Sequence, residues 1–314
     1  MGKASRTKVD VNRREKIAAQ RAAERRAEQR KRILIASGSI VVVLAVVLTF
    51  VIIKLNNKPS ASASSGSNGP TGAALTAVVD KVSTVPTSVS DAVGTGSYTG
   101  KIQTINPAGT ALTSNGKPEM LYMGAEYCPY CAAARWSMIV ALSRFGTFTG
   151  LTTLHSAAAN GAGQAEPDPN TPTWTFLHAH FSSPYLTFST VELQTNIPDT
   201  SNGTYTTLQT PTAAQTALIN KYDAPPYAPS GDNGAIPFID FGNKYVTIGT
   251  PFLPSVMAGL SWATIANDLH NPNSAVAQAV DGTANYFTAA ICKMTGNQPA
   301  SACTSAVQSL ERQI

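Results

Sequence analysis

The sequence is poor in charged residues and lacks the motifs of several large enzyme classes. Only 13% of its 314 residues are charged, and it has just four histidines and four cysteines. It contains no glycine-rich phosphate loop, no nucleophile elbow and no motif of paired carboxylates. Nothing therefore indicates nucleotide phosphate binding, serine-hydrolase chemistry or glycoside cleavage.

Basic residues are concentrated at the N-terminus and are scarce elsewhere. Residues 1–32 hold 12 Lys and Arg against 4 Asp and Glu, which leaves 11 against 14 for residues 33–314. The larger part of the chain thus lacks the excess of cationic side chains that phosphate neutralisation requires. We expect it to bind no nucleic acid.

A long uncharged segment follows the basic tail. Residues 33–53 are 21 positions without a charge or a proline, about 30 Å of helix, which matches the hydrocarbon thickness of a bilayer. A cleaved signal peptide is the alternative, but its apolar region is usually about 7–15 residues long. We predict a single transmembrane helix in the cell membrane, with the N-terminus cytoplasmic and the C-terminal part extracytoplasmic, because basic flanks favour the cytoplasmic side.

These segments divide the chain into four predicted parts. Residues 1–32 form a cytoplasmic tail whose basic side chains favour anionic lipid headgroups, with nucleic-acid binding by the tail as the less favoured alternative. Residues 33–53 span the membrane, and residues 54–74, rich in Ser, Ala, Asn and Gly, form a flexible linker. Residues 75–314 form the extracytoplasmic domain, which is long enough for a sizeable core.

Strand and helix patterns alternate in this domain, which predicts an α/β fold. The expected helices are residues 75–93 with a break at Pro86, 132–145, 212–222, 260–269, 274–294 and 302–313. The expected strands are residues 120–125 and 151–156, a β-rich region over 173–194 interrupted at 182–184, and a hairpin of 236–241 and 244–248. A loop is expected over residues 161–172.

The chemistry is expected at Cys128-Pro129-Tyr130-Cys131, where an apolar strand runs into a helix. Two cysteines at this spacing bind metal or do redox chemistry, and a structural zinc site would need a second ligand pair that the sequence does not offer. At the start of a helix, Cys128 meets unpaired backbone N–H groups that favour its thiolate, and Pro129 suits the first helical position. We therefore expect Cys128 to be the accessible nucleophile of lowered pKa, and Cys131, which follows within one turn, to be the buried resolving thiol.

Residues 123–131 resemble the strand-to-helix active site of the thioredoxin superfamily, with the glutaredoxin dipeptide Pro-Tyr between the cysteines. Residues 235–241 look like the cis-proline strand of that superfamily. The resemblance implies that Pro237 follows a cis peptide bond beside Cys128, that the Ile236 backbone pairs with a bound peptide, and that Tyr130 contributes to substrate binding. Without it, Pro237 would be read as a proline at the start of a strand.

Longer phrases are similar to a prokaryotic family catalogued as domain of unknown function 929. They are residues 125–136, 141–146, 236–245 and 284–292. The similarity extends from about residue 75 to residue 303. It implies a thioredoxin-like fold with insertions and extra C-terminal helices on a membrane anchor, and it implies no particular substrate.

Three residues near the cysteines bear on proton transfer. Tyr122 stands where thioredoxins carry a buried aspartate, and a phenol is a poor proton acceptor at neutral pH. Glu126 is a candidate acceptor by proximity alone, and an exposed loop carboxylate is the favoured reading. Arg135 is either a solvated helix residue, which we favour, or a charge that stabilises the thiolate.

For the remaining two cysteines and for a pair of histidines, we favour structural roles. Cys292 ends one predicted helix and Cys303 opens the next, so we predict a structural disulfide between them, in agreement with an oxidising compartment. His178 and His180 would share one face of a strand. A copper or zinc site formed by them with the Cys-x-x-Cys is one interpretation, but a pair of polar strand residues is favoured, and we expect no metal or other cofactor.

Two functional hypotheses follow. In the first, the protein is a membrane-anchored thiol–disulfide oxidoreductase that acts on exported proteins with thiols or disulfides, together with a redox partner, through Cys128, Cys131 and Pro237. In the second, it is a non-catalytic anchored binding or assembly module on the same scaffold, with a structural disulfide or a bound metal. The intact Cys-x-x-Cys with Pro237 favours the first.

Overall fold

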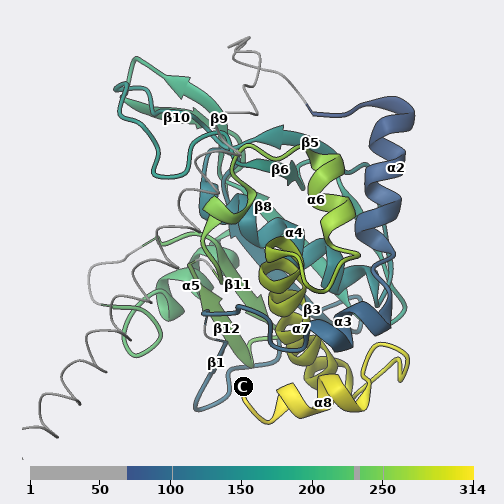
Figure 1. The fold of residues 1–314 in the computed structure, drawn as a ribbon. Coiled ribbons are helices and arrows are strands. Elements are labelled where there is room, and N and C mark those ends of the chain that lie inside the picture. The colour runs from purple at the N-terminus through teal and green to yellow at the C-terminus, as the bar shows by residue number, and fades with distance from the viewer. Residues whose placement is uncertain (1–68, 101, 230–233, 250) are drawn as a thin grey trace, which may run out of the picture. The chain divides into compact units, whose positions relative to one another are not determined.

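The computed structural model describes residues 69–100, 102–229, 234–249 and 251–314. These residues form a mixed α/β domain around a central mixed sheet (Figure 1). The predicted basic tail, the predicted membrane span and most of the predicted linker lie outside the described residues. Among the helices described, none is both long enough and apolar enough to cross a bilayer.

The α-helices overlap the ranges that the sequence predicts. They are α2 (Gly72–Ser83), α3 (Thr87–Val93), α4 (Pro129–Ser143), α5 (Ala213–Tyr222), α6 (Trp262–Asp268), α7 (Ala275–Thr295) and α8 (Ser305–Glu311), with a 3-10 helix η1 (Pro254–Met257). The predicted break at Pro86 is confirmed, since this residue is the N-cap of α3. Helix α2 begins three residues before the predicted start of the domain.

Within the described residues, the strands form one large and three small sheets. They are β1 (Gln103–Thr104), β2 (Thr113–Ser114), β3 (Lys117–Gly124), β4 (Thr147–Thr149), β5 (Thr152–His155), β6 (Pro172–Thr175), β7 (His180–Ser182), β8 (Thr187–Glu192), β9 (Gln194–Asp199), β10 (Thr204–Thr207), β11 (Phe238–Phe241) and β12 (Tyr245–Ile248). Strand β3 pairs in parallel with β8 and antiparallel with β11. The antiparallel pairs β11–β12 and β12–β1 continue the sheet, and β2 pairs with the start of β3.

The predicted hairpin of β11 and β12 is confirmed, and its turn explains why it forms. Gly242 and Asn243 join the strands with φ values of 69° and 56°. Two consecutive positive φ angles are what a type I′ turn needs, and Asn and Gly adopt them readily. The hairpin places Phe238 opposite Met123 on β3, close to the point where β3 leads into the Cys-x-x-Cys.

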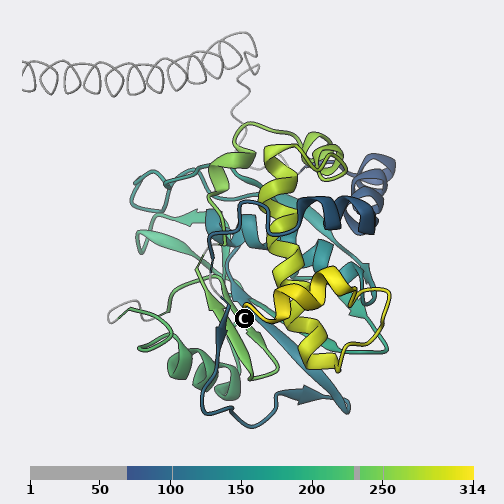
Figure 2. The ribbon, with the colours of Figure 1, turned by 60° about the horizontal axis from the view of Figure 1, so that its bottom comes forward.

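Alternation along β3 gives the sheet two buried faces. Met120 and Tyr122 belong to the core that contains α4 and α7, whereas Leu121 and Met123 pack with residues of α5 on the other face. In Figure 2, α7 runs beside the sheet with α8 near its C-terminal end. Both faces of the strand that carries the site are therefore covered.

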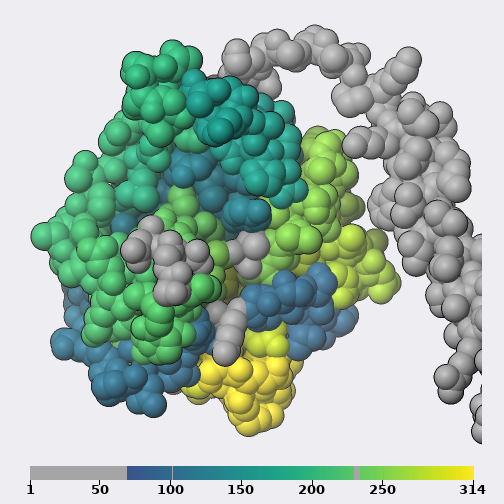
Figure 3. Space-filling model, turned by 90° about the vertical axis from the view of Figure 1, so that its left-hand side faces the viewer, coloured from purple at the N-terminus to yellow at the C-terminus, as the bar shows by residue number. Residues whose placement is uncertain are grey.

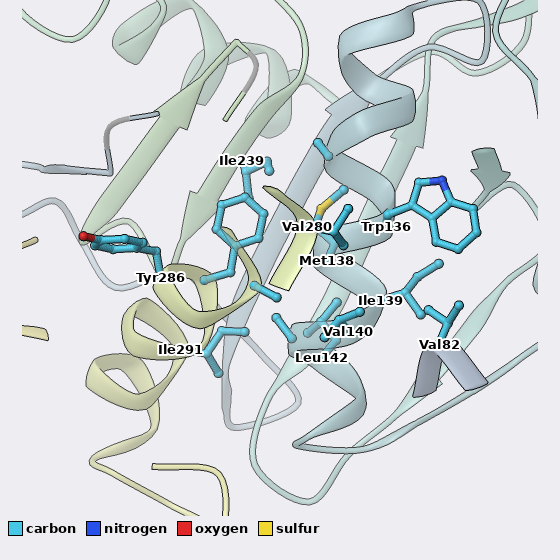
Figure 4. Packing of buried hydrophobic residues seen from close by; sticks show 14 of the residues in the cluster. Val82, Trp136, Met138, Ile139, Val140, Leu142, Ile239, Val280, Tyr286 and Ile291 are labelled. Atoms are coloured by element: carbon cyan, nitrogen blue, oxygen red, sulfur yellow. The ribbon is translucent and has the colours of Figure 1, made fainter. Parts of the chain in front are cut away.

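Helices α4 and α7 form the centre of the main core (Figure 4). All but two residues of α4 are buried, and Trp136 and Ile139 lie on the side that faces Val82 of α2. On the α7 side, the Ser137 hydroxyl donates a hydrogen bond of 2.9 Å to the Val280 carbonyl. Packing on two sides holds the helix that begins at the Cys-x-x-Cys.

The predicted disulfide between Cys292 and Cys303 is present, with Cα atoms 5.7 Å apart. Helix α7 ends at Gly296, which has the left-handed conformation typical of a residue after a helix end. The bridge joins the last turns of α7 to the segment before α8, and both cysteines are buried.

Small sheets between α4 and α5 were only partly predicted. The β-rich region with its interruption is confirmed as β6, β7 and β8, but the hairpin of β9 and β10 was not predicted. Figure 3 faces the side of the molecule on which this hairpin and α5 lie. The hairpin is tied to the loop after β5, because the Gly161 N–H donates to the Thr204 carbonyl at 2.9 Å.

Candidate functional site

The Cys-x-x-Cys lies at the junction of β3 and α4, as the sequence predicts. Cys128 is the N-cap of α4, and Pro129 occupies the first helical position. The Cys128 sulfur accepts the Cys131 backbone N–H at 3.2 Å. This hydrogen bond satisfies one of the unpaired donors of the first turn and favours a negative sulfur.

Both thiols are buried. Cys131 is fully buried, as expected, but Cys128 is only 4% exposed, so our expectation of an accessible thiol is wrong. Side chains from three separate segments pack around the two cysteines: Tyr127, Tyr130, Leu193 and Ile236. These neighbours place Cys128 in an apolar and aromatic environment.

The segment before β11 lies directly against Cys128. The Cys128 thiol is 3.9 Å from the Ile236 carbonyl oxygen, within reach of a weak S–H···O hydrogen bond. The Ile236–Pro237 peptide bond is cis, as the superfamily resemblance implied. The structure thus brings together the four residues Cys128, Cys131, Ile236 and Pro237, with Tyr130 beside them.

Arg135 is fully buried, so the favoured reading of a solvated helix residue is wrong. Its Nε and Nη2 atoms donate to the two carboxylate oxygens of Glu192 at 3.0 and 2.6 Å. Nη2 also donates to the Ala125 carbonyl at 2.8 Å. No local pattern predicts this pair, because Glu192 lies 57 positions further along the chain at the end of β8.

The environment separates the pKa values of the two thiols. Burial raises the pKa of Cys128, but hydrogen bonds from the Cys131 side chain and backbone and the Arg135 cation outweigh it, and the net shift is downward. For Cys131, burial and the neighbouring Cys128 raise the pKa well above its ordinary value, against a smaller opposing effect of Arg135. Cys128 is therefore the group suited to act as nucleophile.

Tyr122 lies under the site as a neutral phenol. Its hydroxyl is buried and has no hydrogen-bond partner among the described residues, and its ring lies 5.6 Å from the Arg135 guanidinium carbon. Burial raises the pKa of Tyr122 well above the usual range, despite the opposing effect of Arg135. This agrees with the sequence argument that Tyr122 is a poor proton acceptor.

Glu126 is 7% exposed, and the favoured reading of an exposed loop carboxylate is wrong. Its backbone N–H donates to the Gln194 carbonyl at 2.9 Å, which extends the contact between the β3 and β8 chain segments. Burial raises the pKa of Glu126, and a hydrogen bond with Thr175 opposes the shift. The Glu126 carboxyl group thus lies near the thiols and holds its proton more strongly than an ordinary glutamate.

The β9–β10 hairpin contributes an aromatic rim that the sequence did not reveal. The ring of Tyr127 stacks on that of Tyr205, with centroids 4.1 Å apart. The Tyr205 hydroxyl donates to Glu166 at 2.5 Å, and the Ala157 N–H donates to the Tyr127 carbonyl at 2.9 Å. The residue before Cys128 is therefore fixed from two sides.

The histidine pair does not form the strand face that the sequence predicts. His178 lies in a turn and His180 begins β7, and both are exposed, so the expectation that they share one strand face is wrong. Within the described ranges, no group of three or more His, Cys, Asp or Glu residues is placed to hold a metal ion.

Comparisons with known proteins place the chain in a family. Residues 103–293, more than half of the chain, match the family described as "Domain of unknown function (DUF929)". The matched range includes both cysteines of the site, Pro237 and Cys292, and it ends before Cys303. No curated protein and no solved structure matches the chain.

Proposed function

The chain belongs to the DUF929 family, whose description names no activity, and we propose from the site itself that the protein is a thiol–disulfide oxidoreductase. One observation carries the proposal: the Cys128 sulfur caps α4, accepts the Cys131 N–H, and lies against the Ile236 carbonyl beside Pro237. A helix-capping thiol of lowered pKa, with a second thiol one turn away, is the arrangement that disulfide exchange requires.

The sheet supports a thioredoxin-like arrangement. The order β8–β3–β11–β12 has one parallel and two antiparallel pairs, with α4 directly after β3. Helix α7 follows β12 and packs on the same face as α4. In this proposal the small sheets between α4 and α5 are insertions, and α8 with its disulfide is a C-terminal addition.

The proposed exchange has two steps. The Cys128 thiolate attacks one sulfur of a substrate disulfide, so that a mixed disulfide forms and a substrate thiolate leaves. Cys131 then loses its proton and attacks the Cys128 sulfur, which forms the 128–131 disulfide and releases the second substrate thiolate. The same steps in reverse oxidise a substrate dithiol. Tyr130 and Ile236 border the position that the substrate sulfur occupies.

The proposed location is the outer face of the cell membrane. Its supports are the apolar run of residues 33–53, the basic tail before it and the disulfide of Cys292 and Cys303, because such bonds persist in oxidising compartments. Exported proteins with thiols or disulfides are then the proposed substrates, and membrane lipid contacts the anchor and tail.

A Ser201→Cys variant tests the proposed topology, since position 201 is exposed. Its labelling by a membrane-impermeant thiol reagent in intact cells is expected, and labelling only in broken cells would reverse the topology.

The activity is tested with cysteine variants of the full-length chain. Wild-type protein should exchange with a model disulfide, Cys128→Ser should lose exchange, and Cys131→Ser should keep the first attack and accumulate mixed disulfides. A double Cys292→Ser, Cys303→Ser variant is the control, because it removes two cysteines that lie outside the site. Its folded fraction should exchange like the wild type. Absence of exchange from folded wild-type protein would end the proposal.

The burial of Cys128 favours the second hypothesis, a non-catalytic binding module. A thiol that is 4% exposed reacts slowly with large partners unless the surrounding side chains move. The same exchange assay decides between the two, because a binding module with buried thiols would leave both a small disulfide and a protein disulfide unchanged.

A further inference from the structure

The buried ion pair of Arg135 and Glu192 is not explained by stability. Both side chains are fully buried, and the pair is the only salt bridge within the described residues. Removing two charges from water costs several kcal/mol per ion, and apolar residues of similar volume often serve stability as well or better. A feature this costly at an active site calls for a role in the chemistry of the site.

The pair is oriented with its cation toward the thiols. Arg135 Nη2 donates to the Ala125 carbonyl, and the same carbonyl accepts the Cys128 backbone N–H at 3.3 Å. The Ala125 carbonyl thus accepts hydrogen bonds from both the Arg135 guanidinium group and the Cys128 backbone. Glu192 Oε1 also accepts the Phe176 backbone N–H at 3.2 Å, which draws part of its charge toward β6.

We infer that this ion pair sets the direction of electron flow, so that the Cys128–Cys131 disulfide oxidises substrate dithiols. Arg135 is the positioning residue that stabilises the reduced, anionic state of the site, and the substrates are exported proteins that arrive with two free thiols. The inference rests on the proposed function. Its physical basis is that a dithiol whose thiolate is stabilised gives up its electrons reluctantly, which makes its disulfide the stronger oxidant.

The electrons and protons of the reaction balance within one turnover. A substrate thiolate attacks the Cys128 sulfur, the 128–131 bond breaks, and the Cys131 sulfur leaves with the electron pair and takes up a proton. The second substrate thiolate then attacks the substrate sulfur of the mixed disulfide and forms the substrate disulfide. Cys128 leaves as a thiolate next to Arg135, and two electrons have passed from the substrate to the protein.

Charge variants with opposite expected signs test the inference in the full-length chain. The measured quantities are the equilibrium constant with reduced and oxidised glutathione and the Cys128 pKa from thiolate absorbance. Arg135→Gln should shift the equilibrium toward the disulfide form by about tenfold, the effect of one pKa unit, and raise the Cys128 pKa. Glu192→Gln should move both quantities the other way. A merely structural role would give no such reversal of sign.

Two further variants protect the test against misfolding and non-specific effects. Arg135→Gln combined with Glu192→Gln leaves no unpaired buried charge, and it should shift the equilibrium in the same direction as Arg135→Gln alone. Arg144→Gln is the matched control at the other end of α4, because its guanidinium bonds to Ser90, Asn285 and Thr288 instead. The control should leave both quantities unchanged.

The direction itself is read from a single turnover without added oxidant. The oxidised chain is mixed with a reduced peptide that contains two cysteines, and the reduced chain is mixed with insulin. Peptide oxidation without insulin reduction supports the inference. Insulin reduction without peptide oxidation overturns the inference while the proposed exchange activity stands. Equal shifts of the glutathione equilibrium in the Arg135 and Arg144 variants do the same. Failure of both reactions instead removes the proposed function.

Discussion

Asp281 should reduce the stability of the folded domain at neutral pH, and replacing it should raise that stability. The side chain is fully buried in α7, and neither carboxylate oxygen has a hydrogen-bond partner among the described residues. Burial raises the pKa of Asp281 from 3.8 to about 8, against a smaller opposing effect of Arg144. At pH 7 the folded protein therefore holds a proton on Asp281 that the unfolded chain has lost.

The sign and size of the effect follow from proton linkage. Between pH 3.8 and about 8 the folded state binds one more proton than the unfolded state, so the free energy of unfolding falls as pH rises. The slope is at most about 1.4 kcal/mol per pH unit, which amounts to about 4 kcal/mol between pH 4 and pH 7. Asp281→Asn has a similar shape and no titrating proton, so it should be more stable than the wild type by about 2–4 kcal/mol at pH 7.

Guanidinium unfolding of both proteins at pH 5 and pH 8 checks this. The stability difference between variant and wild type should grow with pH. An exposed aspartate on α2 offers the control, since Asp80→Asn should change stability by less than about 0.5 kcal/mol at either pH. If Asp281→Asn follows the wild-type pH dependence, or is the less stable protein at pH 8, the reasoning is refuted.

Three other stability predictions are independent of the site chemistry. Removing the disulfide with Cys292→Ser and Cys303→Ser should cost about 3 kcal/mol by loop entropy, and graded reduction with mass spectrometry should show this bond opening after any 128–131 disulfide. Gly124→Ala should destabilise the folded domain by about 1–3 kcal/mol in chemical unfolding, because the new Cβ would lie 2.0 Å from the Tyr122 hydroxyl oxygen. Adding Tyr122→Leu to this variant should remove most of that cost. Thr212→Ala should cost about 1 kcal/mol in thermal unfolding by removing the capping box of α5, and an unchanged midpoint would contradict it.

Local sequence signals predicted the elements that depend on local physics. The helix break at Pro86, the turn at Gly242 and Asn243 and the cap at Cys128 each follow from the conformational limits of one or two residues. The hairpin of β9 and β10 has a turn signal at Asn202 and Gly203, but its strands are polar and one contains Pro198, so the strand pattern on both sides of the turn is weak. Its packing partner Tyr127 is distant in the sequence.

The errors over Arg135 and Glu126 share one physical cause. Charged side chains are rarely buried without a partner, so a single sequence favours exposed positions for both. The partner of Arg135 is Glu192, and that of Glu126 is Thr175, and neither is near in sequence. A single sequence shows which residue types are present but not which distant strand brings a charged or hydrogen-bonding partner. The cysteine positions were predicted because their geometry depends only on one helix start.

The bridge between α7 and α8 also changes what a protease can release. Residues 296–301 are partly exposed between the two cysteines, whereas Val307 and Leu310 of α8 are buried in the main core. A single cut in this loop leaves the C-terminal fragment attached through Cys292 and Cys303. The fragment should separate on a denaturing gel only after reduction, so that a nicked sample reports the oxidation state of this pair without any label on the thiols of the site.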